Sequence, residues 1–190
     1  NRLGEWKGEN PLKNMRPFRT EEMEMAWLTH DQISQLLGEC KRHDHPDLET
    51  VVRICLATGA RWSEAESLKK SQLAKYKITY TNTKGRKNRT VPISKELYES
   101  LPDDKKDRLF SDCYGAFRSA LERTGIELPA GQLTHVLRHT FASHFMMNGG
   151  NILVLQRVLG HTDIKMTMRY AHFAPDHLED AVKLNPLNKQ

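Results

Sequence analysis

The stretch KITYTNTKGRKNRTVPI, from Lys77 to Ile93, differs in pattern from the sequence around it. Residues 77–83 and 89–93 are rich in β-branched side chains, and the loop between them contains a glycine. Two such runs around a glycine-containing loop are typical of a β-hairpin. The stretch therefore predicts a small sheet, and the fold class depends on what flanks it.

Helical signals lie on both sides of this hairpin. Thr29-His-Asp-Gln32 is a capping box that opens an amphipathic segment to about residue 42. Residues 48–57 have the pattern of a second helix ended by Gly59, and Ser63-Glu-Ala-Glu66 opens a third. Further helices are predicted at about residues 95–101, 112–123, 133–147, 152–159, 163–172 and 176–184. These patterns predict an α+β fold that is mainly α with a small antiparallel β-sheet.

Composition places few limits on function. The chain has 190 residues, which suits a single domain with its own core. Lys and Arg number 29 against 24 Asp and Glu, and the net charge of +5 indicates nucleic-acid binding only where positive side chains cluster. Cys40, Cys55 and Cys113 form no C-x-x-C pair, which favours a reducing, cytoplasmic location. No apolar run approaches a membrane span, and no signal pattern opens the sequence.

Residues 1–26 are expected to be an interdomain linker. The segment is polar, and glycines and prolines interrupt any long periodicity in it. We expect it to lead from a further N-terminal domain outside this sequence. Residues 27–173 would then form the main domain, and residues 174–190 a C-terminal tail with one short helix.

The hairpin loop concentrates positive charge. Such a loop suits the phosphate backbone of a nucleic acid. A solvated surface turn is the alternative, and charged loops are more often that than a binding site. The cations, which are too close in sequence to spread far apart, are Lys84, Arg86, Lys87 and Arg89.

Residues 134–145, THVLRHTFASHF, carry a second group of functional side chains. On a helix, Leu137, Phe141 and Phe145 recur every four residues as a core stripe. His135 and Arg138 lie three apart and are predicted to face outward together. Two cationic donors on one face could bind an anion, or could be ordinary surface residues.

A zinc site is the other interpretation of this helix. His135 and His139 have the H-x-x-x-H spacing of a metalloprotease helix. The position that would hold the catalytic glutamate is Val136, and no further ligand follows at a suitable spacing. The sequence therefore predicts no metal site.

Residues 56–64, LATGARWSE, place an arginine at a helix boundary. Gly59 breaks the preceding helix, so Arg61 emerges at the start of the next element, where backbone N–H groups also face outward. Glu64 lies three residues on and can hold the guanidinium. A surface Arg–Glu pair of little energetic weight is the alternative.

Residues 151–160 read as a helix with a glycine C-cap, which holds His161 at a helix junction. Tyr170 falls within the helix predicted next. A lone tyrosine at such a place is usually half-buried packing. Its interpretation depends on the motifs that precede it.

The order of these motifs resembles the tyrosine recombinase (phage integrase) family, and the resemblance runs from about residue 27 to residue 172. Within the family, the pattern is most similar to integrases of temperate phages of enteric bacteria. Thr83 departs from it, because a glycine is frequent there. The matching segments are TGARWSE at 58–64, the lysine hairpin at 83–93, and the two most specific ones, HVLRHTFA at 135–142 and LGHTD at 159–163 followed by Tyr170.

The resemblance implies the catalytic-domain fold of a site-specific recombinase that cleaves and rejoins DNA through a covalent 3′-phosphotyrosine. Tyr170 would be the nucleophile. A phenol has a pKa near 10, so its proton must be removed as it attacks, and His135 is the expected acceptor. Lys84 would protonate the leaving 5′-oxygen.

The same resemblance assigns the groups that stabilise the phosphate. Attack on the phosphodiester adds negative charge to its oxygens, and fixed cationic donors there lower the barrier. Arg61, Arg138 and His161 are the expected donors, with Glu64 supporting Arg61. The expected DNA-binding residues are Arg86, Lys87, Arg89 and His139.

No cofactor is expected, because the phosphotyrosine keeps the energy of the broken bond and a 5′-hydroxyl can reseal the strand without metal or nucleotide. The implied partners are double-stranded DNA attachment sites, a homo-tetramer in the synaptic complex and DNA-bending accessory proteins, with no membrane, in the bacterial host cytoplasm. The reaction would integrate or excise phage DNA. The tail at 174–190 would pack on a neighbouring protomer or on its own domain.

Two other classes remain open. A type IB topoisomerase would use the same covalent chemistry but reseal the same strand, so synapsis of two duplexes discriminates it. A non-catalytic DNA-binding module would lack one of the reactive side chains, and the sequence holds all of them.

Overall fold

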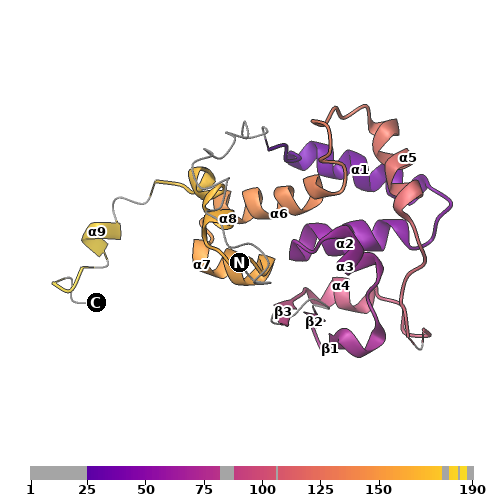
Figure 1. Cartoon of the computed structure of the whole chain (residues 1–190), viewed down its shortest axis with the longest axis horizontal. Helices are drawn as coiled ribbons and strands as arrows, with labels where there is room; N and C mark the ends of the chain where they lie inside the picture. The colour runs from indigo at the N-terminus through magenta and orange to yellow at the C-terminus, as the bar shows by residue number, and fades with distance from the viewer. Residues whose placement is uncertain (1–24, 82–87, 106, 177–179, 184, 188–190) are drawn as a thin grey trace, which may run out of the picture.

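The computed structural model describes residues 25–81, 88–105, 107–176, 180–183 and 185–187. Within them the chain is mainly helical (Figure 1). The α-helices are α1 (His30–Arg42), α2 (Leu48–Thr58), α3 (Trp62–Glu66), α4 (Lys95–Glu99), α5 (Tyr114–Thr124), α6 (His135–Met147), α7 (Ile152–Leu159), α8 (Lys165–Met168) and α9 (Asp180–Lys183). The 3₁₀ helices are η1 (Lys70–Gln72) and η2 (Ala171–Phe173).

The predicted hairpin is present as part of a three-stranded antiparallel sheet in the order β1-β2-β3. The strands are β1 (Leu73–Ala74), β2 (Lys77–Tyr80) and β3 (Arg89–Pro92). Ile78 pairs with Val91, and Tyr80 pairs with Arg89. The two-residue strand β1 escaped sequence analysis because so short a segment has no detectable alternation. Lys84, Arg86 and Lys87 lie outside the described residues.

The first two helices begin and end where their signals predict. Thr29 is the N-cap of α1: its hydroxyl accepts from the Gln32 N–H at 3.3 Å, and the Gln32 side chain accepts from the Thr29 N–H at 2.9 Å. Gly59 follows α2 with φ 64°, the left-handed conformation that glycine adopts without strain. A side chain there would also collide, since a Cβ atom would lie 2.5 Å from the Phe141 ring and 2.7 Å from Leu159.

Two hydrophobic clusters form the core, and α6 contributes to both. The larger joins α1, α2, α5 and the sheet, and it receives Val136 and Leu137 from the start of α6. The smaller consists of Ala142, Met146, Leu155, Leu159 and Tyr170. Figure 1 shows α6 extending from α1 and α2 toward α7 and α8, so one helix connects the two parts.

The prediction that Arg138 faces outward from α6 is wrong. Its side chain is buried, because its guanidinium donates to carbonyl groups near the ends of two other helices. Such carbonyls lack a partner within their own helix and need a donor from elsewhere. His135 is exposed as predicted, whereas Phe141 and Phe145 of the predicted stripe are only half-buried.

The single helix predicted at residues 163–172 is also wrong. The chain instead forms α8, a bend at Arg169 and Tyr170, and then η2. Bonds between residues three apart, from the Tyr170 N–H to Thr167 O and from the Phe173 N–H to Tyr170 O, tighten the turn beyond that of an α-helix. This path brings the Tyr170 ring into the smaller cluster, where it is fully buried.

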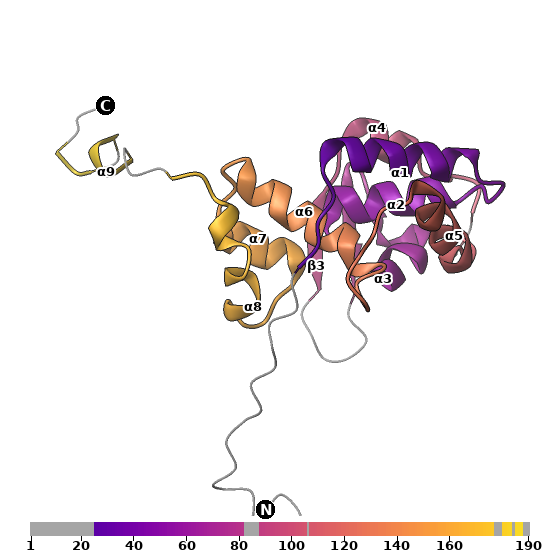
Figure 2. The ribbon, with the colours of Figure 1, turned by 90° about the horizontal axis from the view of Figure 1, so that it is seen from above.

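Of the C-terminal helix predicted at residues 176–184, the described part is α9, which stands apart from the other helices in both views (Figures 1 and 2). Val182 is 71% exposed. Leu178 and Leu184 lie outside the described residues. Nowhere in the described ranges is a helix both long and apolar enough to cross a membrane.

Candidate active site

Arg61 stands at the N-terminal boundary of α3, immediately after the turn made by Gly59 and Ala60. Glu64 accepts the Arg61 backbone N–H at 2.9 Å through one carboxylate oxygen. Its other oxygen accepts from the Arg61 guanidinium at 3.1 Å. The Arg61 side chain keeps about a third of its surface exposed. Glu64 therefore fixes Arg61 and leaves other N–H groups of the Arg61 guanidinium free to bind a ligand.

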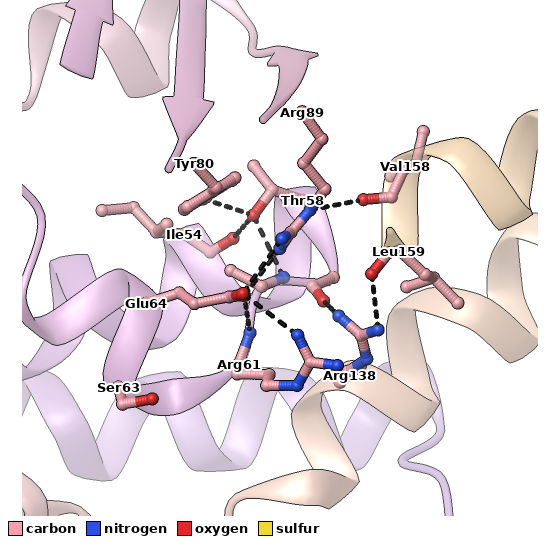
Figure 3. A network of polar contacts seen from close by, with 12 residues as sticks. Ile54, Thr58, Arg61, Ser63, Glu64, Tyr80, Arg89, Arg138, Val158 and Leu159 are labelled. Atoms are coloured by element: carbon pink, nitrogen blue, oxygen red, sulfur yellow. Dashed lines mark hydrogen bonds and ion pairs between the residues drawn. The ribbon is translucent and has the colours of Figure 1, made fainter. Parts of the chain in front are cut away.

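Glu64 has a second and closer partner in Arg89, on strand β3 (Figure 3). Arg89 binds both carboxylate oxygens, at 3.0 and 2.6 Å, in the bidentate geometry that makes such pairs strong. Its Nε donates to the carbonyl of Val158 at the end of α7, 2.9 Å away. The guanidinium also lies over the Tyr80 ring, 4.5 Å from its centre.

Arg89 is thus only 10% exposed and engaged on three sides. We predicted a DNA contact at this residue from its place in the basic hairpin. The geometry gives it a different position, at the junction of the sheet, α3 and α7. Glu64 remains ionised there: burial alone would raise its pKa, but the ion pairs with Arg89 and Arg61 outweigh burial and lower the pKa to about 2.

Arg138 crosses from α6 to the ends of two other helices (Figure 3). One guanidinium nitrogen donates to Gly59 O and the other to Leu159 O, both at 2.7 Å. Burial, followed by repulsion from Arg61 and Arg89, lowers the pKa of Arg138 to about 10. The side chain is therefore still charged at neutral pH, and it adds positive charge beside Arg61.

His161 follows Gly160, which ends α7 with φ 68°. The ring Nδ1 lies 2.9 Å from the Thr167 hydroxyl, which fixes its orientation. Burial, with the cationic neighbours Arg138 and Arg61, lowers the pKa of His161 to about 4. The ring is neutral at pH 7 and has one N–H with which to donate a hydrogen bond.

Tyr170 lies between α8 and η2, with its ring buried and its hydroxyl 2.7 Å from Nδ1 of His139. Burial raises the pKa of the Tyr170 phenol, and Arg138 and Arg169 oppose the rise. The pKa of His139 is lowered to about 4, mainly by burial and then by Arg169. A neutral imidazole therefore meets a protonated phenol.

One cavity of about 430 Å³ joins these groups. It includes six of the predicted site residues, which come from four separate stretches of the sequence. Lys165, Met166 and Arg169 also line it and were not predicted, although Arg169 is the direct neighbour of Tyr170 in the sequence. The predicted residues that the cavity brings together are Arg61, His135, Arg138, His139, His161 and Tyr170.

The remaining predicted residues do not line this cavity. Glu64 and Arg89 lie behind Arg61 as its support. Lys84, Arg86 and Lys87 belong to the part of the hairpin loop outside the described residues. Within the described part of the chain, no three His, Cys, Asp or Glu side chains gather as a metal ion would require.

Sequence comparison places this arrangement among known proteins. Residues 26–177 match the phage integrase family. This chain belongs to that family. The resemblance found in the motifs is thereby confirmed over most of the sequence.

Two phage integrases are similar to the chain over nearly its whole length. The integrase of Escherichia phage 186 is 98% identical over 187 residues, which are 98% of this chain and 56% of that protein. The integrase of Haemophilus phage HP1 (strain HP1c1) is 64% identical over 186 residues, 98% of this chain and 55% of that relative. The chain thus spans about half the length of the curated relatives it matches.

Solved structures agree on the fold. The catalytic domain of bacteriophage HP1 integrase matches with a TM-score of 0.84 at 67% identity, over 86% of this chain and 97% of that domain. The XerH recombinase bound to a palindromic difH substrate matches with a TM-score of 0.62 at 23% identity, over 84% of this chain and 53% of its own. The predicted fold, mainly α with a small antiparallel sheet, is confirmed as that of the phage integrase catalytic domain.

Proposed function

We propose that this chain is the catalytic part of a site-specific DNA recombinase, an integrase that breaks and rejoins strands through a 3′-phosphotyrosine at Tyr170. The observation that carries the proposal is the single cavity that Tyr170 shares with Arg61, Arg138 and His161. A phenol beside two arginines and a histidine suits attack on a phosphodiester, because the donors can bind the oxygens that gain charge.

The phosphate would lie against Arg61 and Arg138. Guanidinium groups bind phosphate through two parallel hydrogen bonds, and Arg138 is held in position by two backbone carbonyls before any substrate arrives. The His161 ring, fixed by Thr167, would donate a third hydrogen bond. Glu64 would keep Arg61 in place, as its two bonds to that residue support.

Two proton transfers complete the scheme. The phenol loses its proton as the bond from Tyr170 to phosphorus forms, and the departing 5′-oxygen gains one as its bond to phosphorus breaks. His135, exposed on the first turn of α6, is one candidate for the first transfer. Lys84 on the hairpin loop is the proposed acid for the second.

The substrate and assembly follow from the same proposal. Arg86 and Lys87 would bind the backbone of a duplex attachment site beside the cavity. A homo-tetramer would hold two duplexes together, with DNA-bending proteins as accessory partners, and the tail beyond residue 173 would pack on a neighbouring protomer or on its own domain. The reaction would integrate or excise phage DNA in the host cytoplasm.

A nicked suicide duplex tests the reaction, because loss of the short 5′-hydroxyl fragment traps the covalent intermediate. The wild-type protein should form an adduct that survives denaturing electrophoresis. Tyr170→Phe keeps the ring and removes only the nucleophilic oxygen, so adduct formation should fall at least about 10³-fold while DNA binding persists. An adduct that maps to the exposed Tyr114 would refute the assignment. Relaxation of supercoiled DNA without any exchange between two duplexes would favour a type IB topoisomerase instead.

A further inference from the structure

The Tyr170 hydroxyl has a hydrogen-bond partner that the motif analysis did not assign to it. His139 Nδ1 lies 2.7 Å from the phenol oxygen, well within the range of a strong hydrogen bond. Among the described residues, no hydrogen bond joins His135 to Tyr170. His135 is one helical turn earlier on α6, with its ring centre 6.3 Å from that of His139.

We propose that His139 is a further catalytic residue, which accepts the phenol proton of Tyr170 during strand cleavage and returns it during rejoining. The inference rests on the proposed strand-cleavage function and specifies one step of it. In cleavage, the Tyr170 O–H bond breaks and its proton passes to His139 Nδ1, while the phenol oxygen bonds to phosphorus. The bond from phosphorus to the 5′-oxygen breaks, and that oxygen takes a proton from the acid on the other side.

The ring is in the correct protonation state before the reaction. The proposed step uses the tautomer with its hydrogen on Nε2, in which Nδ1 accepts from the Tyr170 hydroxyl. The charged or titratable groups that act on the ring are Arg169, beside Tyr170, and His135 and Arg138 on α6. Burial is the main cause of the lowered pKa of His139, and these groups add to it, so the ring carries no extra proton in the absence of DNA.

Burial and the neighbouring positive charges would make His139 a weak base if nothing changed on binding. A phosphodiester in the cavity supplies the opposite charge next to Arg138 and Arg61. Its negative charge offsets the cations that depress the basicity of His139, so the ring becomes a better acceptor only when substrate is bound. Proton transfer from Tyr170 is therefore tied to occupation of the cavity.

His135 provides the matched control. It lines the same cavity and is also a histidine of α6, but its side chain is exposed and it lies one helical turn before His139. If His139 takes the proton, then the two histidines must respond differently to a change in the acidity of the phenol. Replacing Tyr170 by 3,5-difluorotyrosine makes such a change, because the fluorines lower the phenol pKa and reduce the need for a base.

The experiment measures the single-turnover rate of adduct formation on the nicked suicide duplex, with DNA affinity measured alongside. His139→Gln can still accept a hydrogen bond but cannot take a proton, and we expect the rate to fall about 10²-fold at unchanged DNA affinity. Difluorotyrosine at position 170 should restore at least about a tenth of the wild-type rate in this variant, consistent with general-base behaviour. However much His135→Gln slows adduct formation, difluorotyrosine at position 170 should not restore its rate comparably.

Three results would overturn the inference. A wild-type rate in His139→Gln would make the ring dispensable, and a loss of the same size with both phenols would make it a positioning residue only. Rescue in His135→Gln but not in His139→Gln would assign the proton to His135. In all three cases the wild-type adduct still forms, so the proposed function stands. Absence of that adduct would instead refute the function and the inference together.

Discussion

The two halves of the cavity are held in place by different kinds of contact. The arginine half is fixed by charged groups and backbone carbonyls, with both oxygens of Glu64 and three carbonyl groups engaged. The tyrosine half rests on the smaller hydrophobic cluster and on single side-chain hydrogen bonds. The arginine half comprises Arg61 and Arg138, which line the cavity, with Glu64 and Arg89 behind them, and the tyrosine half comprises His139, His161 and Tyr170.

This difference indicates that the arginines proposed to bind the phosphate are held in place without DNA, whereas Tyr170, the proposed nucleophile, is held by fewer bonds. A charge-assisted bidentate pair is roughly twice as strong as a neutral hydrogen bond, which contributes about 1 kcal/mol. We therefore expect changes in the arginine half to affect both folding and catalysis, and changes in the tyrosine half to affect chemistry with less effect on folding.

Among the changes that test this comparison, Arg138→Ala should have the largest effect. Loss of a cation that binds the phosphate should slow adduct formation on the order of 10²- to 10³-fold. The two carbonyls left without a donor should lower the free energy of unfolding by about 2 kcal/mol. Single-turnover cleavage and chemical denaturation measure the two effects. A variant that loses activity but keeps wild-type stability would break the proposed link between the two roles.

The helices and the hairpin could be predicted from the sequence because their signals are local. Thr29 with Gln32, and Gly59 after α2, act within a few residues of their own position. The pairing of Arg89 with Glu64 joins residues 25 apart, and it depends on how the sheet packs against α3 and α7. The sequence therefore identified Arg89 as a cation but not its partner.

The sequence predicted the residues of the tyrosine half but not the contacts between them. His139 follows Arg138 directly, so its place near the site was foreseeable. Its contact with Tyr170 depends on the bend between α8 and η2. The sequence pattern of residues 163–172 predicted one continuous helix, so this bend was missed. The bend accompanies burial of the Tyr170 ring, and that burial depends on tertiary packing, which a local sequence pattern does not reveal.

An intermediate effect is expected for Arg89→Lys, which keeps the charge and removes the bidentate contact. Glu64 would then hold Arg61 less firmly, and adduct formation should slow about 10-fold, as for a misplaced catalytic group. DNA affinity should change little, because Arg89 is buried behind the site.

Arg118→Lys is the matched control for that variant, since Arg118 pairs with Glu122 in an exposed contact on α5. Exposed pairs of this kind contribute about 0–1 kcal/mol, so this variant should behave as wild type. If Arg89→Lys weakens DNA binding but leaves the cleavage rate of bound DNA unchanged, then Arg89 is a DNA contact after all.

The smallest effect is expected for the dependence of stability on pH, in which the two halves contribute over different pH ranges. The pKa values of His139 and His161 are lowered to about 4 in the folded protein, whereas an unfolded histidine titrates near 6.5. Between these values the unfolded chain binds more protons, so stability falls as pH decreases from 6.5 toward 4. Glu64, with its pKa lowered to about 2, stabilises the fold fully above about pH 4.5, and this contribution is lost only as the pH falls from there toward 2.

Thermal unfolding between pH 7 and pH 5 measures this dependence. The melting temperature should fall by a few degrees over that range, in proportion to the protons taken up by the tyrosine half. His161→Gln should reduce the slope, because one of the two neutral histidines is removed. An unchanged slope in that variant would mean that the pH dependence arises elsewhere in the chain.

The bond between Arg138 and the Gly59 carbonyl, 79 positions earlier, also has a consequence for protein synthesis. A ribosome makes α1 to α5 and the sheet first, and these elements supply most of the larger hydrophobic cluster. The contacts of Arg138 cannot form until α6 has emerged, and Tyr170 is added later still. A growing chain can therefore acquire a folded scaffold well before it carries Tyr170, so translation products that end earlier would lack the proposed nucleophile.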